Sequence, residues 1–243
     1  MANLLEETWR TYSGNIKLVL LFSIPFIISF LIPVLAPMPA YVTAGGIFLR
    51  TAGLFINTNP ITLSIIVIAV FFSLLFLSFA FVAISLIVKS ERTHTKIAAS
   101  VLKDTEKYTG RVFILLLFYV FVLFIANIMG YYLDIEAALT AIVGFVLFMA
   151  IFYAPTAIVI DNKRLGRAIK DSARLVLRKP QYFVLWFLLI AVVVSVLDYV
   201  FIGIFGGVIG SYALLLVNSL LVVPYFVIYQ AQAYMKRYPI LMH

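Results

Sequence analysis

Long apolar runs separated by short polar segments dominate the pattern of this chain. Crossing about 30 Å of hydrocarbon takes roughly 20 helical residues. Six runs approach or exceed that length: Leu18–Val34, Ile61–Val88, Val112–Leu133, Ala137–Ile160, Tyr182–Ile204 and Tyr212–Tyr234. The runs are continuous rather than alternating, and an open strand edge would leave backbone groups unpaired in lipid. The pattern therefore predicts an all-α polytopic membrane protein with six transmembrane helices.

Composition agrees with a single membrane domain over residues 1–243. The chain is 65% hydrophobic and 12% charged, whereas a soluble domain carries roughly 25% charged residues. Glu6, Glu7 and Trp9 precede the first apolar run, and no small-residue cleavage site follows it. We therefore expect the first span to be retained rather than removed as a signal peptide. The absence of cysteine excludes disulfides and thiolate chemistry.

The basic residues are distributed very unevenly among the segments between the spans. Of the 18 Lys and Arg residues, 17 fall on the side that holds both termini, and only Arg50 falls on the other. Positive residues in short loops stay cytoplasmic. The distribution predicts a protein of the cytoplasmic membrane with both termini inside.

A basic cytoplasmic face favours binding of anionic lipid headgroups or of an acidic partner. Ordinary topogenic charge is the alternative, because the orientation rule alone requires most of these bases. The bases are not interleaved with exposed aromatic residues, which argues against nucleic acid as a partner. The candidate headgroup contacts are Lys96, Lys103, Lys107, Arg111, Arg167, Lys170, Arg174 and Arg178.

Three segments of the chain resemble one another. Tyr12–Asn15 lies 96 positions before Tyr108–Arg111, and Thr109–Arg111 lies 70 positions before Lys179–Gln181. The pattern predicts three units, each an amphipathic cytoplasmic helix, a turn residue (Gly14, Gly110 or Pro180) and a hairpin of two spans. The alternative is the accidental periodicity of any hairpin protein. The units are residues 4–88, 97–160 and 168–234, with an outer-loop insertion at 36–59.

Four features near the span ends predict local structure. Pro155 and Pro224 lie late in the second spans of units two and three, where each proline should bend its helix. The run Gly46–Ile56 is too short to span and predicts an interfacial or re-entrant helix. Asn59 and Pro60 predict an N-cap and a first helical residue. A tight outer turn is favoured over a helix contact at the glycines Gly203, Gly206, Gly207 and Gly210.

One acid and two asparagines inside the apolar runs are candidate polar sites. Asp198 is about six residues from the outer end of its span, roughly 9 Å at 1.5 Å per residue. It is a candidate for proton or ion handling, but at that depth a structural ion pair with Arg50 is favoured. Asn127 and Asn218 are candidate intramembrane polar sites, although such residues more often form hydrogen bonds between helices.

Enzyme signatures are missing from the sequence. The chain has two histidines, His94 and His243, which are too few for an HExxH or His-rich metal site. No GxSxG elbow, phosphate loop or dinucleotide fingerprint occurs. We therefore expect no catalytic residues, no cofactor and no metal.

Residues Phe152–Asp161, followed by Arg167–Ser172, carry a resemblance. A span ends there in a proline and an acid, and a helix with an Ala-x-x-x-Ser core follows. The segment resembles the six-helix membrane domain found beside glycerophosphodiester phosphodiesterases, and archaeal relatives that lack an enzyme domain. It covers roughly Phe152–Val193 and recurs more faintly around Ile97–Phe121. The phosphodiesterase domain is absent from this chain, so the resemblance implies architecture and not activity.

These patterns favour a non-enzymatic membrane scaffold that organises lipid or assists a membrane-protein partner through its basic helices. The alternative is a transport or channel protein, with an oligomeric pore because one protomer has few polar residues for a pathway. Convergence of Asp198, Asn127 and Asn218 on one cavity would indicate transport, and their dispersal would favour the scaffold.

The charge distribution makes a direct prediction about orientation. A cysteine introduced at Asp104 or Asp171 should react with a membrane-impermeant maleimide only from the cytoplasmic side, because both residues lie among the cytoplasmic bases. Labelling of intact and of opened cells checks this. Reaction of both positions from the outside would contradict the orientation.

Overall fold

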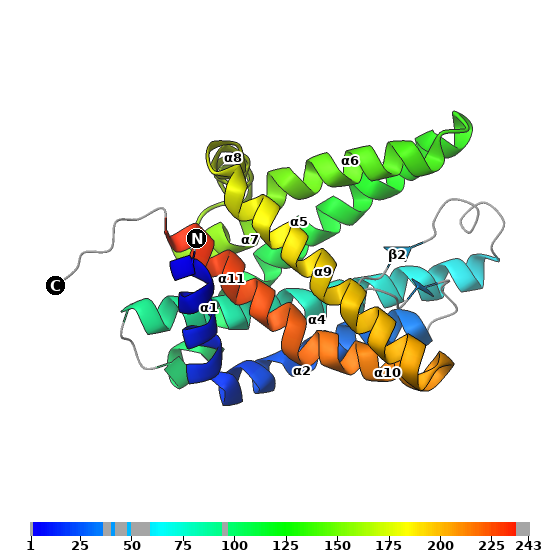
Figure 1. Ribbon diagram of the computed structural model, residues 1–243. Coiled ribbons are helices and arrows are strands. Elements are labelled where there is room, and N and C mark those ends of the chain that lie inside the picture. Colours follow the sequence, from blue (N-terminus) through cyan, green and yellow to red (C-terminus); the bar gives the residue numbers. More distant parts are fainter. Residues whose placement is uncertain (1, 36–39, 42–47, 50–58, 94–96, 237–243) are drawn as a thin grey trace.

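The computed structural model describes residues 2–35, 40–41, 48–49, 59–93 and 97–236, and nearly all of them are helical (Figure 1). Each of the six apolar runs overlaps one helical stretch long and apolar enough to cross a membrane, which confirms the six predicted spans. Within the described residues these stretches are Ile16–Leu35, Pro60–Glu91, Asp104–Tyr132, Ala138–Asp161, Pro180–Phe205 and Gly207–Met235.

The elements follow the chain in a simple order. Two short strands, β1 (Ala40–Tyr41) and β2 (Phe48–Leu49), pair antiparallel. A π-helical turn, η2 (Asn218–Val222), interrupts the last span. The α-helices are α1 (Ala2–Gly14), α2 (Ile16–Leu35), α4 (Pro60–Thr93), α5 (Ile97–Tyr132), α6 (Glu136–Ile151), α7 (Ala154–Asp161), α8 (Leu165–Arg178), α9 (Pro180–Phe205), α10 (Gly207–Val217) and α11 (Val223–Met235).

The expected helix over Gly46–Ile56 is wrong where the structure describes that run. Phe48 and Leu49 form strand β2 instead of a helical turn. The adjacent glycines Gly45 and Gly46 disfavour a helix start, since glycine costs about 1 kcal/mol relative to alanine in a helix. The rest of the run, including Arg50, lies outside the described residues.

The signals at two span ends act as the sequence predicts. The side-chain oxygen of Asn59 accepts a hydrogen bond from the backbone N–H of Ile61 at 3.1 Å, and Pro60 is the first residue of α4. Gly206 and Gly207 separate α9 from α10 with φ values of 70° and 34°. This left-handed region favours glycine, so the predicted tight turn falls at these two residues.

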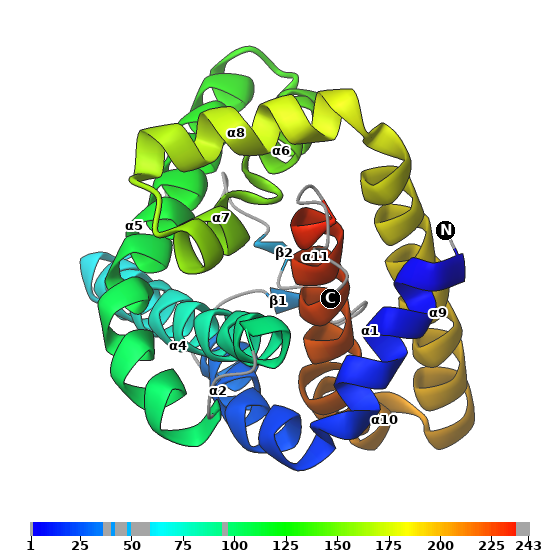
Figure 2. The same cartoon turned by 90° about the vertical axis from the view of Figure 1, so that its left-hand side faces the viewer.

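The second spans of the three predicted units gather at the centre of the molecule. Helix α4 contacts both α7 and α11, and α7 contacts α11. Figure 2 shows these three helices in the middle, with α2, α5 and α9 around them. Their central residues are buried: Ile84 and Ile87 of α4, Ile158 of α7 and Ile228 of α11 are all 0% exposed.

Shorter helical segments pack around this centre at the end of the molecule that holds both chain termini, called here the terminal end (Figure 1). Helix α1 packs against α11. Helix α8 packs against α6, α7 and α9. The first turns of α5 lie beside the end of α4, where the Lys89 amine is 5.5 Å from the ring centre of Tyr108. We call α1, the first turns of α5 and α8 the lead helices.

One lead helix differs from the expected pattern. A turn was predicted at Gly110, but α5 runs without interruption from Ile97 to Tyr132. Thr109 donates its hydroxyl to the carbonyl of Thr105 at 2.7 Å, which fits a helical backbone there. A single glycine costs a helix only about 1 kcal/mol, and no proline follows it as Pro180 follows Lys179 in unit three.

The glycines near the turn between α9 and α10 supply a matched pair for mutation. A Cβ on Gly210 would collide with the backbone carbonyl of Phe201, whereas a Cβ on Gly203 would meet nothing within 4 Å. We therefore expect Gly210→Ala to destabilise the protein by about 1–3 kcal/mol, as overpacking does. Gly203→Ala should be neutral or slightly stabilising. Thermal unfolding in detergent measures both, and equal effects would contradict the close approach.

Candidate functional site: the polar layer at the terminal end

The fourth span is broken two residues before its proline. Helix α6 ends at Ile151 and α7 begins at Ala154, with Pro155 as its second residue. The break leaves backbone groups without helical partners, and side chains from two other elements bind them. The N–H of Tyr153 donates to Ser172 Oγ of α8 at 2.8 Å, and Gln230 Nε2 of α11 donates to the carbonyl of Phe152. Such rescue by neighbours is what a lipid-embedded break requires.

The sixth span departs from α-helical geometry at the corresponding place. The π-helical turn η2 ends at Val222, and Pro224 is the second residue of α11. A proline cannot donate to the preceding turn and its ring collides with the carbonyl four residues earlier. The wider π turn fits that restriction. Pro155 and Pro224 thus each follow directly on a local departure from the α-helix.

A compact ionic cluster joins α7, α8 and α11. The Lys163 amine lies 2.8 Å from a carboxylate oxygen of Asp161 and 2.8 Å from one of Asp171. It also donates to the Tyr234 hydroxyl at 3.2 Å. Tyr234 in turn donates to Asp161 Oδ2 at 2.6 Å. Lys163 therefore lies between the end of one helix, the side of the next and the last span.

The chain reaches this cluster through a reversal at Asn162. Asn162 ends α7 in the left-handed conformation, with φ of 52°, which asparagine tolerates better than most residues. Its side-chain oxygen accepts a hydrogen bond from the Arg111 guanidinium of α5 at 2.9 Å. Arg111, a candidate headgroup contact, thus binds a neighbouring loop within the protein.

Electrostatics around Lys163 favour its charged form. Burial lowers the pKa of the amine, but hydrogen bonds with Asp161, Asp171 and Tyr234 outweigh burial, so the pKa of Lys163 is raised above its usual value. While both carboxylates are ionised, the raised lysine pKa stabilises the fold in full at pH values below about 10, and this contribution is lost as the pH rises through the folded-state pKa.

A second group of polar contacts holds α1 against the last span. Gln232 Nε2 donates to Thr11 Oγ1 at 2.9 Å. Thr11 is 2% exposed and Gln232 is 3% exposed, so this hydrogen bond is buried. Nearer the surface, the Lys236 amine lies 3.4 Å from a carboxylate oxygen of Glu7. The N-terminal and C-terminal helices of the described chain are therefore in direct polar contact.

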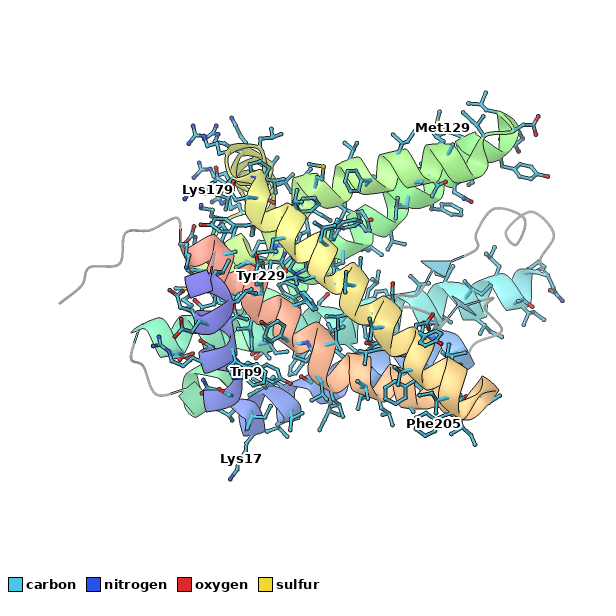
Figure 3. All side chains as sticks on the ribbon, in the orientation of Figure 1. Trp9, Lys17, Met129, Lys179, Phe205 and Tyr229 are labelled. Atoms are coloured by element: carbon cyan, nitrogen blue, oxygen red, sulfur yellow. The ribbon has the colours of Figure 1, made fainter. Side chains whose placement is uncertain are left out.

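Helix α8 presents two different faces. Its buried face packs on the bundle and consists of Ala168, Ser172, Leu175 and Val176. Its exposed face contains four of the predicted headgroup contacts, Arg167, Lys170, Arg174 and Arg178. Leu177 lies beside the last two and is 75% exposed. Lys179 follows at the junction with α9 and is labelled in Figure 3.

The corresponding face of α1 has a different charge. Its exposed residues include one acid, Glu6, and one base, Arg10. Trp9, labelled in Figure 3, is 61% exposed beside them. Both faces therefore combine charge with an exposed apolar side chain, but only the face of α8 is strongly basic.

The three candidate intramembrane polar residues lie on three different elements. Asn127 of α5 donates to Thr140 Oγ1 of α6 at 3.2 Å, which is a hydrogen bond between neighbouring helices. Asn218 lies in η2 beside α2 and is fully buried, and Asp198 lies on α9. The tips of the α5–α6 and α9–α10 hairpins, near Met129 and Phe205, point in different directions (Figure 3).

Several predicted site residues fall partly or wholly outside what the structure describes. Arg50 and Lys96 lie outside the described residues, so the proposed Arg50–Asp198 ion pair is not placed. The backbone of Lys103 belongs to α5. Lys107 is exposed, and its amine is 5.3 Å from the ring centre of Tyr108.

The sequence did not point to the polar side chains that join α7, α8, α1 and α11 at the terminal end. Gln230, Gln232 and Lys163 were not singled out, and Ser172 was noted as the serine of the Ala-x-x-x-Ser core but not as a hydrogen-bond partner. Two glutamines within an apolar span were a usable signal, because intramembrane polar side chains need partners. Their partners, a broken backbone and a threonine from the opposite end of the chain, were not deducible from spacing.

Among the described residues, no group of three His, Asp or Glu side chains is placed to hold a metal ion. Comparison with known protein families, with curated proteins and with solved structures finds no match.

The contact between Ser172 and Tyr153 makes a clear prediction. Ser172→Ala should leave a buried N–H without a partner and destabilise the protein by about 1–3 kcal/mol. For soluble proteins of this length each kcal/mol lowers Tm by roughly 2–4 °C. Ser13→Ala is the matched control, because Ser13 is exposed and bonds only within its own helix. Equal Tm losses in detergent would contradict the bracing role.

Proposed function

We propose that this protein is a non-enzymatic multi-pass scaffold of the cytoplasmic membrane that gathers anionic lipid headgroups at its cytoplasmic face. The terminal end is the cytoplasmic side in this proposal, since the sequence assigns 17 of the 18 Lys and Arg residues to the segments on the same side of the spans as both termini. The exposed face of α8 is the observation that carries the proposal. It has four bases and an exposed leucine, while its opposite face is fixed on the bundle.

The exposed leucine supports a membrane surface as the environment of α8. Leu177 lies one residue from Arg178 and three from Arg174, so apolar and basic groups share one face. An interfacial helix needs this combination, because its apolar groups enter the acyl region while its bases meet the phosphates. Trp9 on α1 supports the same placement, since tryptophan favours the membrane interface.

The contacts between helices support a threefold repeat. Helix α8, which opens unit three, packs on the second span of unit two, and the first turns of α5 lie beside the second span of unit one. Helix α1, which opens unit one, packs on the second span of unit three. In this proposal the units form a closed ring in which each amphipathic lead helix lies under the preceding hairpin (Figure 2).

The alternative, a transport protein, is less favoured by the polar residues inside the spans. A pathway needs polar groups that line one cavity. Asn127 bonds to a neighbouring helix, and Asp198 and Asn218 lie on other elements of the bundle. The use of Asn127 in a contact between helices favours the scaffold. A homo-oligomer or a membrane-protein partner is compatible with the scaffold. The basic face of α8 favours anionic lipid as its binding partner.

Neutralising two bases on α8 tests the proposal. Each Lys or Arg near an anionic surface contributes about 1 kcal/mol. Arg174→Gln with Arg178→Gln should therefore lower the preference for phosphatidylglycerol over phosphatidylcholine by roughly tenfold or more. Native mass spectrometry of protein taken from mixed-lipid nanodiscs counts the retained lipids.

Arg10→Gln with Lys17→Gln is the control, because it removes the same charge from exposed positions of unit one. This variant should keep most of the preference for phosphatidylglycerol. Equal losses in the two double variants would show that only net charge matters, and an unchanged preference in the α8 variant would refute the proposal.

A further inference from the structure

Aromatic side chains form a continuous seam between α6 and α9. It consists of Phe145 and Phe148 of α6, Phe152 directly after α6, and Phe183, Trp186 and Phe187 from the start of α9, and is called here the aromatic seam. The ring centres of Phe152 and Phe183 are 5.0 Å apart, and those of Phe145 and Phe187 are 6.0 Å apart. The Trp186 indole N–H donates to the carbonyl of Phe226 at 3.1 Å, which fixes the seam on the last span.

The seam has a buried side and an exposed side. Phe152 and Phe183 are 2% and 3% exposed, whereas Phe145 and Phe187 are 47% and 43% exposed. Figure 1 shows α6 and α9 diverging from this region toward their far ends. Because both helices are membrane spans, the exposed rings face acyl chains rather than water.

The basic end of α8 adjoins this seam directly. Helix α8 packs on α6 and ends at Arg178, and α9 begins two residues later at Pro180. Figure 2 shows α8 crossing from the side of α6 to the start of α9. Arg178 therefore lies near the terminal end of the seam by chain connection, and Arg174 lies one helical turn earlier on the same exposed face.

We propose that this corner is a binding site for one anionic phospholipid, whose phosphate is held by Arg174 and Arg178 and whose acyl chain lies along Phe145 and Phe187. The inference rests on the proposed function and narrows the lipid contact from the whole basic face of α8 to a single lipid-binding site. Guanidinium groups match phosphate oxygens with paired hydrogen bonds. An ordered aromatic surface between diverging helices gains dispersion contacts when an acyl chain covers it.

Tryptophan fluorescence can test this lipid site, because the chain has only two tryptophans, Trp9 and Trp186, and one of them can be replaced. In the variant Trp9→Phe, emission comes from Trp186 alone, within the seam. Nanodiscs of phosphatidylcholine contain a small fraction of a lipid brominated on its acyl chain, which quenches a nearby indole. The brominated lipid is phosphatidylglycerol in one sample and phosphatidylcholine in the other.

A depth-matched reporter serves as the control. Ile24 follows Lys17 by seven residues, as Trp186 follows Lys179, and Ile24 is 46% exposed on α2. The control variant carries Ile24→Trp with Trp9→Phe and Trp186→Phe. It reports on the lipid beside unit one, whose lead helix has a mixed-charge face.

Brominated phosphatidylglycerol should quench Trp186 well beyond brominated phosphatidylcholine, which corresponds to a roughly tenfold higher local occupancy. The Ile24→Trp reporter should be quenched about equally by both lipids. Adding Arg174→Gln and Arg178→Gln should remove the difference at Trp186.

The outcomes separate this inference from the proposed function. One outcome is that both brominated lipids quench Trp186 equally while the α8 double variant still loses retained phosphatidylglycerol. That result would overturn the single lipid site but leave the proposed lipid-binding scaffold intact. Equal preference for phosphatidylglycerol at both reporters would also overturn it, because the lipid would then be enriched without a specific site. If the unaltered protein shows no preference for phosphatidylglycerol over phosphatidylcholine, both the lipid site and the proposed function would be overturned.

Discussion

The structure depends on one constraint: a helix broken inside a membrane must find partners for its freed backbone groups within the protein. The fourth span is broken at Phe152 and Tyr153, and the partners are Gln230 of α11 and Ser172 of α8. Two hydrogen bonds at one break thus fix α8 and the last span relative to α7. The Lys163 cluster joins the same three helices a short distance further along the chain.

Fixing α8 by its buried face determines what its other face presents. Because Ser172 is committed to the break in the fourth span, Arg167, Lys170, Arg174 and Arg178 are directed away from the bundle. The internal polar layer and the external basic face are therefore two sides of one helix. This relationship connects the packing of the spans to the proposed binding of anionic lipid.

The sequence was sufficient for the spans and for several of their ends, but not for their assembly. Apolar length predicts all six spans because hydrocarbon thickness sets helix length regardless of tertiary contacts. Asn59 and Gly206 act through local backbone geometry, so their roles were also predictable. Gly110 failed as a predicted break because one exposed glycine is too weak to interrupt a helix. The run Gly46–Ile56 failed because apolar content alone does not distinguish a short helix from a strand.

The candidate site was less predictable than the fold for a physical reason. The basic face of α8 follows from helical spacing within 14 residues, and the sequence identified it. The internal layer depends on partners far apart in the chain, such as Gln232 and Thr11, whose positions are separated by 221 residues. Spacing within one helix carries no information about such pairs.

The contact between α1 and α11 is the most direct test of the closed arrangement, because it joins the two ends of the chain. The protein has no native cysteine, so Glu7→Cys with Lys236→Cys, at the partly exposed ion pair of this contact, gives a reactive pair without background reaction. A short bifunctional maleimide applied in native membranes should link the two residues within one chain, as peptide mass spectrometry would identify. Failure to link, or linkage only between separate chains, would contradict the contact of α1 with α11 and the proposed ring of three units.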